Sequence, residues 1–139
     1  MAYSESQPTV TLIAETTFSS GDLYKFVQMS TTTGRVSIVE STAPNFVVGT
    51  LLSETHTTST GANEAVTIGL LSGIGKVRMA ASTLHAGATI GCSTNGLGII
   101  VGATTDTAQI GMTVEGLSGS TNERIHSVLF QAQVRRPTT

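Results

Sequence analysis

The sequence predicts an all-β protein: a single compact barrel or sandwich of short strands, built from two pseudo-repeats, with an extended N-terminal arm. Three observations support this fold class. Short apolar runs are interrupted by turn-forming residues, and one order of glycines, turns and apolar runs occurs twice along the chain. Threonine is abundant, with 24 of 139 residues, and its β-branched side chain favours an extended, pleated backbone.

The repeat can be followed block by block. Gly49, within an apolar run, matches Gly111 at a distance of 62 positions (111 − 49). The other matches are 18–21 with 84–87, 30–34 with 93–96, 36–39 with 99–101, 46–52 with 108–114, 63–66 with 122–125, and Leu70 with Leu129. No catalytic pattern recurs with these blocks, so the duplicated object is a scaffold. Each half is too short to bury a large core alone, and we expect the halves to share one.

Three segments follow from this division: an N-terminal extended arm at 1–17, a β domain at 18–134 and a C-terminal tail at 135–139. The pseudo-repeats are placed at about 18–80 and 84–134. In the arm, Pro8 disfavours helix at the preceding residue. Residues 9–14 alternate, so that Val10, Leu12 and Ala14 share one side of an extended segment. This segment either adds to a sheet edge, its own or a neighbour's, or is an ordinary first strand after a frayed tail.

The β domain is expected to contain short strands at roughly ten-residue spacing, which is typical of a barrel or sandwich. In the first half, strands are expected within 23–29, 36–39, 46–52, 65–71 and 76–80, with a polar loop at 53–63. A helical turn fits only 80–85. The second half repeats this plan and ends on the clearest alternation, which directs four side chains inward: Val128, Phe130, Ala132 and Val134.

Composition excludes several classes of function. The net charge is −2, only 12% of residues are charged, aromatics make up 4% and Trp is absent. A nucleic-acid partner is therefore not expected, since there is neither a basic patch nor a set of stacking rings. No apolar run is long enough to span a bilayer, and no signal peptide is recognised, so synthesis in a cytosol is expected. Cys92 is the single cysteine and is expected to be a small buried hydrophobe.

No catalytic or metal-binding constellation is found. The three histidines are widely separated and lack metal-ligand spacing, and we expect His56 in a solvated loop, His85 in a turn and His126 facing outward from a strand. No Gly-x-Ser-x-Gly motif exists, and Asp22 and Asp106 are expected to serve turn geometry. Hence no enzymatic activity, cofactor or metal is expected.

Four segments together resemble a phage family. They are Ser-Gly-Asp-Leu-Tyr at 20–24, Val-Val-Gly-Thr-Leu at 47–51, Glu-Ala-Val-Thr-Ile-Gly at 64–69 and Gly-Lys-Val-Arg-Met at 75–79. In this order they are similar to the capsid cement or head-decoration proteins of tailed bacteriophages, especially the β-rich proteins related in shape to the lambda head decoration protein. The resemblance covers about residues 18–130. The 53–63 loop and the full second copy are less typical of the lambda protein.

The resemblance implies a structural protein without enzymatic activity that stabilises the shell by clamping coat subunits. Such proteins sit as homotrimers on threefold positions of the capsid's outer surface, so the implied partners are the major capsid protein and the chain itself. The implied location is the virion, after synthesis in the host cytoplasm. The capsid-contact arm would fall on Pro8, Val10, Leu12 and Ile13. The alternative is a head or tail fibre module, or an adhesion domain for a host surface, although sparse aromatics and short length argue against these.

Overall fold

The computed structural model describes residues 7–41, 47–56, 63–80, 85–101, 108–116 and 123–135, and this part of the chain is all-β apart from one short 3-10 turn, η1 (Ser20–Asp22). The expected loop at 53–63 and helical turn at 80–85 fall largely outside these residues. The strands are β1 (Thr9–Ile13), β2 (Phe26–Met29), β3 (Val36–Ile38), β4 (Val47–Leu51), β5 (Ala65–Leu70), β6 (Ile74–Met79), β7 (Thr89–Cys92), β8 (Gly98–Ile100), β9 (Ala108–Thr113) and β10 (Arg124–Arg135).

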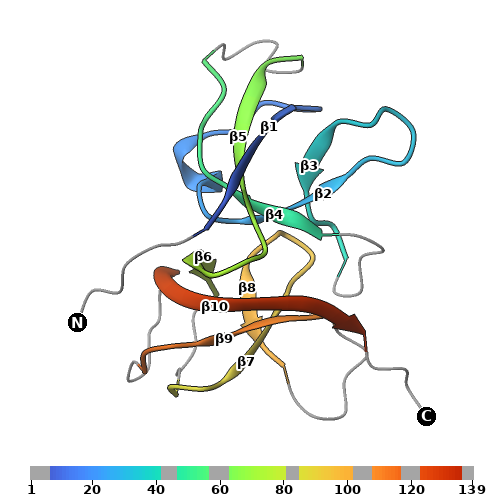
Figure 1. Cartoon of the computed structure of the whole chain (residues 1–139). Coiled ribbons are helices and arrows are strands. Elements are labelled where there is room, and N and C mark those ends of the chain that lie inside the picture. The colour runs from blue at the N-terminus through green and yellow to red at the C-terminus, as the bar shows by residue number, and fades with distance from the viewer. Residues whose placement is uncertain are drawn as a thin grey trace.

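The strands form two units, one above the other in Figure 1. The first unit is a five-stranded sheet in the order β1-β5-β4-β2-β3, and the second is a closed barrel in the order β10-β6-β8-β7-β9. Each unit uses strands that are consecutive in sequence. The predicted all-β class is thus confirmed.

The two units have the same pattern of strand pairing. In the first unit, β1 pairs with β5, β5 with β4, β4 with β2 and β2 with β3, all antiparallel. In the second, β6 pairs with β10, β10 with β9, β9 with β7 and β7 with β8, again all antiparallel. The duplication therefore begins at β1 and again at β6. The expected boundary near 80–84 is wrong, because β6 pairs within the second unit.

The register confirms that Gly49 and Gly111 are equivalent. Gly49 lies opposite Val27 and Leu70, while Gly111 lies opposite Ile90 and Phe130. A Cβ added to either glycine would strike a neighbouring strand's carbonyl oxygen, and would do so at equivalent positions. The register also matches Leu70 to Phe130, so the expected match of Leu70 with Leu129 is wrong by one residue.

The turns before β2 and β7 are equivalent as well. Tyr24 N–H donates to the Leu51 carbonyl, and Gly87 N–H donates to the Thr113 carbonyl, both at 2.8 Å. Both residues adopt positive φ, 67° for Tyr24 and 81° for Gly87. The expected match of 18–21 with 84–87 is therefore shifted, since Gly87 corresponds to Tyr24 and not to Gly21.

One equivalent parallel pair joins the end strands of each unit. Met79 pairs with Gly98, which joins β6 to β8 and closes the barrel, and Ala80 N–H donates to the Gly98 carbonyl at 2.9 Å. In the first unit Ala14 bridges Val36 in parallel, just beyond the end of β1, and Glu15 N–H donates to the Val36 carbonyl at 2.8 Å. The first unit is therefore a five-stranded sheet of the same design, whose end strands β1 and β3 meet at this bridge.

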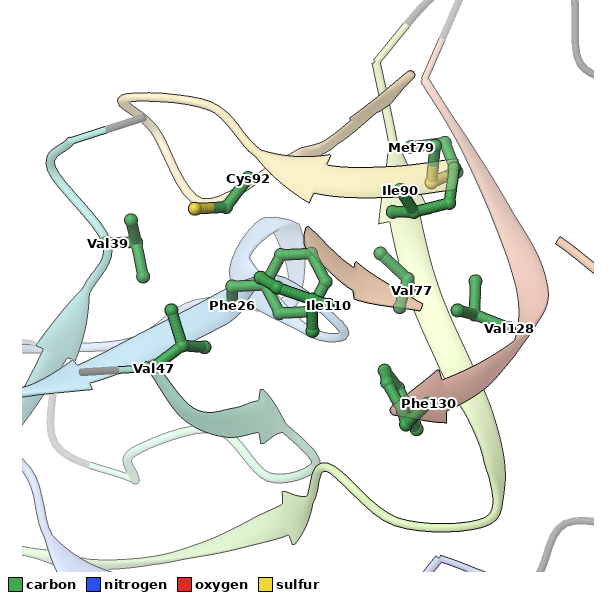
Figure 2. Close-up of a cluster of buried hydrophobic side chains, with 10 residues drawn as sticks. All are labelled: Phe26, Val39, Val47, Val77, Met79, Ile90, Cys92, Ile110, Val128 and Phe130. Atoms are coloured by element: carbon green, nitrogen blue, oxygen red, sulfur yellow. The ribbon is translucent and has the colours of Figure 1, made fainter. Parts of the chain in front are cut away.

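Two hydrophobic clusters fill the units. The sheet core lies in the first unit and contains Ala14, Phe18, Val27, Val36, Val48, Leu51, Val66 and Ile68. The barrel core contains Val77, Met79, Ile90, Cys92, Ile110, Val128 and Phe130, together with Phe26, Val39 and Val47 from the first unit (Figure 2). The expectation of one shared core therefore holds only for the barrel core, because the first unit also has a core of its own.

The junction between the units is fixed by hydrogen bonds as well as by Phe26. Phe26 N–H donates to the Gly96 carbonyl at 2.7 Å. Arg78 N–H donates to the Tyr24 carbonyl at 2.8 Å, and Arg78 Nε donates to the Leu23 carbonyl at 3.0 Å. Segment 23–26 of the first unit is thereby held against the end of β6 and the turn between β7 and β8.

Candidate binding surface

The N-terminal segment is the edge strand of the protein's own first sheet. The Pro8 carbonyl accepts from Leu70 N–H and Ala14 N–H donates to the Glu64 carbonyl, both at 2.8 Å. Since backbone groups alternate in direction along an antiparallel pair, those of Thr9 and Thr11 point away from β5. The extended conformation was expected, but residues 9–13 do not stand free of the domain.

The four expected contact residues do not form one surface. Val10 and Leu12 are half-buried and pack on the sheet core of their own unit. Pro8 is exposed, and the Ile13 side chain is 42% exposed on the opposite face of β1. Contact of these residues with a capsid stays a prediction, and Ile13 is the apolar side chain among them that remains available.

Gln7 is a structural residue that the sequence did not reveal. Its Nε2 donates to Thr50 Oγ1 at 3.1 Å and to the Leu70 carbonyl at 3.0 Å. Its carboxamide occupies the space beside Gly69 and Gly75, where any Cβ would overlap it. Gln7 thus connects the start of β1 to both units. In the sequence, Gly69 and Gly75 are the residues that leave space for its side chain.

A hollow of about 590 Å³ lies on the first unit beside β2 and β3. It is lined by Glu15, Thr16, Gln28, Met29, Ser30, Thr31, Ser37 and Glu40. One lining carboxylate, Glu15, accepts a hydrogen bond from Thr33 Oγ1 at 3.1 Å. The lining carries hydroxyls and carboxylates but no histidine or cysteine to activate a nucleophile. Within the described residues, no three His, Cys, Asp or Glu side chains gather as a metal site.

The titratable side chains serve the fold. Cys92 is fully buried, as expected, and burial raises the pKa of its thiol to about 11. Asp22 accepts from Ser19 N–H at 3.0 Å in η1 and pairs with Lys25 at 3.0 Å, which agrees with its expected turn role. Asp106 lies outside the described residues. His56 is exposed, as expected.

His126 is buried, so its expected outward orientation is wrong. It shares the inward face of β10 with Val128 and Phe130, and its side chain is 7% exposed. Burial lowers the pKa of His126, the nearby Glu115 carboxylate opposes this shift, and Arg124 adds to it. The net direction is below the ordinary value of 6.5.

We therefore expect acid to destabilise the protein through His126. The unfolded chain binds this proton more readily than the folded one, so the free energy of unfolding falls as pH drops below about 6.5. Melting temperatures measured between pH 7.5 and 5.5 should fall less steeply for His126→Gln than for the wild type. His56→Gln, at a side chain that is 94% exposed, is the control for the loss of one histidine. Equal slopes for His126→Gln and wild type would contradict this assignment.

Comparison with models of known protein families gives no match, and comparison with curated proteins gives no significant match. In the part of the chain that the structure describes, no helix has the length and apolar character to cross a membrane. The described residues thus offer the outward edge of β1, a polar hollow and exposed aliphatic side chains as surfaces for binding.

Proposed function

We propose that the protein is a structural component of a bacteriophage virion. In this proposal it binds the outer surface of the capsid as a homotrimer and stabilises the shell by clamping the major capsid protein. It performs no catalysis and uses no cofactor. The support from sequence is the resemblance of segments 20–24, 47–51, 64–69 and 75–79 to head-decoration proteins.

The observation that carries the proposal is the outward edge of β1. Proteins normally cover or interrupt edges that would pair with other chains. Here β1 is an end strand of the first sheet, and the backbone groups of Thr9 and Thr11 point away from β5, the strand with which β1 pairs. An open edge suits strand addition, in which an extended segment of a partner forms main-chain hydrogen bonds. We place the coat-protein contact at this start of β1, next to Pro8.

The exposed side chains favour this role over a fibre or adhesion module. Among the described residues, the large exposed hydrophobic side chains are aliphatic: Ile13, Ile100, Met112, Ile125 and Leu129. Sugar-binding surfaces need exposed aromatic rings, whereas contacts between protein subunits can use aliphatic ones. The exposed side chains therefore favour a protein subunit over a sugar as the partner.

Thr11→Pro tests the edge contact. Proline is tolerated on an edge strand where its nitrogen faces outward, yet it removes the outward N–H and obstructs an added strand. We expect at least about tenfold weaker co-sedimentation with capsids that lack the protein. Thr11→Ala keeps the N–H and should bind like the wild type, and both variants should melt near the wild-type temperature.

Two outcomes would count against the proposal. Undiminished binding by Thr11→Pro would place the capsid contact elsewhere. Counting copies per particle tests the role itself, since a clamping protein is present in hundreds of copies over the shell and a fibre in a few at a vertex. A low copy number would overturn the capsid role.

A further inference from the structure

The two units contact each other through different surfaces. The front surface of the first unit is the outward side of β2, β4 and β5 with segment 23–26, and that of the second unit is the same side of β7, β9 and β10. The rear surface of the first unit is the end of β1 with the turn that follows β2. The rear surface of the second unit is the end of β6 with the turn that follows β7. Within the chain, the front surface of the first unit covers the rear surface of the second, at Arg78 and Gly96. Because the units are equivalent, the second unit has a front surface of its own and the first unit has a rear surface of its own.

The second unit's front surface is apolar and uncovered. In the first unit, Phe26, Thr50 and Gly69 form one row across the sheet, and all three are buried. The same row in the second unit is Thr89, Met112 and Leu129. Met112 is 39% exposed, against 0% for its counterpart Thr50, and Leu129 is 41% exposed. Two large aliphatic side chains therefore face solvent at positions whose counterparts are buried.

The rear surface of the first unit is uncovered as well. Arg78, which binds segment 23–26, corresponds to Ile13, and the Ile13 side chain is 42% exposed. Gly96 corresponds to Gly34, and both adopt positive φ, 75° and 68°. A Cβ at Gly96 would lie 2.7 Å from Ile38 Cγ2 and 2.8 Å from the Phe26 carbonyl, whereas one at Gly34 would meet nothing within 4 Å.

The 590 Å³ hollow lies at this same rear surface. Its Met29 corresponds by register to Cys92 of the second unit. Cys92 is fully buried there, and its Sγ donates to the Ser41 carbonyl of the first unit at 3.5 Å. The first unit thus has a hollow at a place where the second unit is covered by its neighbour.

Most of the large exposed apolar side chains lie on or beside the two uncovered surfaces. Of the five large ones among the described residues, Met112 and Leu129 belong to the uncovered front surface and Ile13 to the uncovered rear surface. Ile100 lies on β8 beside the front surface, and its counterpart, Ile38, lies close to the Gly96 turn at the covered junction. The fifth, Ile125, corresponds to Ala65, which is exposed and outside the junction.

We propose that the partner of both uncovered surfaces is a second copy of this chain. The front surface of one copy's second unit, at Met112 and Leu129, docks on the rear surface of the next copy's first unit, at Ile13 and Gly34. The contact is heterologous, so it closes into a ring or continues as a filament according to its rotation. A ring of three copies would place six units in succession. This inference assigns a surface to the self-association in the proposed function and rests on that part of it, but not on the capsid role.

Sedimentation equilibrium of the purified full chain, without capsids, tests the contact. We expect the wild type to associate, and Met112→Asp/Leu129→Asp and Ile13→Asp each to weaken association at least about tenfold, because a charge replaces buried aliphatic surface. Ile125→Asp is the matched control: its side chain is 43% exposed, lies on the same strand and face as Leu129, and should leave association unchanged. If circular dichroism shows that Met112→Asp/Leu129→Asp is unfolded, Met112→Gln/Leu129→Gln replaces it.

Mixing the two defective proteins gives the sharpest result. Each retains one intact surface, so an equimolar mixture of Met112→Asp/Leu129→Asp with Ile13→Asp should form one-to-one dimers and nothing larger. Three results would overturn the inference: a wild type that stays monomeric up to about 100 μM, equal weakening by Ile125→Asp, or a mixture that remains monomeric. Association through these residues without capsid binding would leave this inference intact and overturn the capsid role. Capsid binding by a monomeric wild type would overturn this inference and the homotrimer, and leave the capsid role intact.

Discussion

Phe26→Ala is expected to lower the free energy of unfolding by about 3–5 kcal/mol, the range for removing a fully buried phenylalanine. Phe26 belongs to β2 of the first unit, yet its ring lies within the barrel core among residues of the second (Figure 2). Removal of the ring therefore opens a cavity in the barrel core and also weakens the junction between the two units. Chemical denaturation followed by circular dichroism would measure the loss.

Phe18→Ala is the matched control for the junction effect. Phe18 is also fully buried, but it lies in the sheet core of the first unit. Both substitutions should destabilise the protein by similar amounts. Hydrogen exchange should separate them, since Phe26→Ala is expected to reduce protection in β6, β7 and β9 as well as in the first unit. If Phe26→Ala changes protection in the first unit alone, the barrel does not depend on this ring.

Gly49→Ala is expected to lower the free energy of unfolding by more than about 3 kcal/mol, or to prevent folding, because the atoms that the new Cβ would meet belong to the backbone. The new Cβ would overlap the Gly69 carbonyl oxygen and lie 2.8 Å from its carbon, on the adjacent strand β5. Neither atom can rotate away without breaking the pairing of β4 with β5. Gly111→Ala should be destabilising in the same way but less so, since its Cβ would lie 2.5 Å from the Leu129 carbonyl oxygen.

Any Gly→Ala substitution lowers the conformational entropy of the unfolded chain, and Gly21→Ala is the control for this effect. A Cβ there has its nearest neighbour, Ser19 Oγ, at 3.6 Å, which is an ordinary contact. We expect this variant to melt at or slightly above the wild-type temperature. A Gly49→Ala protein that melts within a few degrees of wild type would show that β4 and β5 can separate without loss of stability.

The sequence was sufficient for the fold class and for the duplication, because both depend on local signals. Gly49 and Gly111 matched correctly since the same close approach of strands excludes a side chain at both. The repeat boundary was missed because a strand's partner is not a local property. Alternation of Val77 and Met79 identifies β6 as a strand, but only its pairing with β10 assigns it to the second unit.

Two individual errors have specific causes. The sequence predicts that Gly87 matches Gly21, because glycine is the usual residue at positive φ, whereas in the first unit Tyr24 adopts that conformation. The polar type of His126 predicts an outward side chain, whereas its position in the alternation, shared with Val128 and Phe130, predicts the inward one that the structure shows. In both cases the local backbone geometry decides the outcome, a turn at Tyr24 and a strand at His126, and not the residue's usual preference.

The candidate surfaces were predictable only in part. Alternation at 9–14 correctly indicated an extended segment with one apolar side, but the pattern cannot distinguish a partner's sheet from the protein's own. Met112 and Leu129 gave no signal, since apolar residues on both faces of a strand also occur in buried strands. Their exposure became informative only by comparison with the buried counterparts Thr50 and Gly69 in the first unit.

The use of consecutive strands in each unit has a consequence during synthesis. All strands of the first unit, which end at Leu70, emerge from the ribosome before those of the barrel, which end at Arg135. At about 5–20 residues per second, the remaining 65 residues (135 − 70) require roughly 3–13 s. During that interval Phe26, Val39 and Val47 have no barrel core to enter. The nascent chain therefore presents an uncovered apolar face for seconds, and we expect ribosome-bound chains halted near residue 100 to recruit hydrophobic-binding chaperones that full-length chains no longer bind.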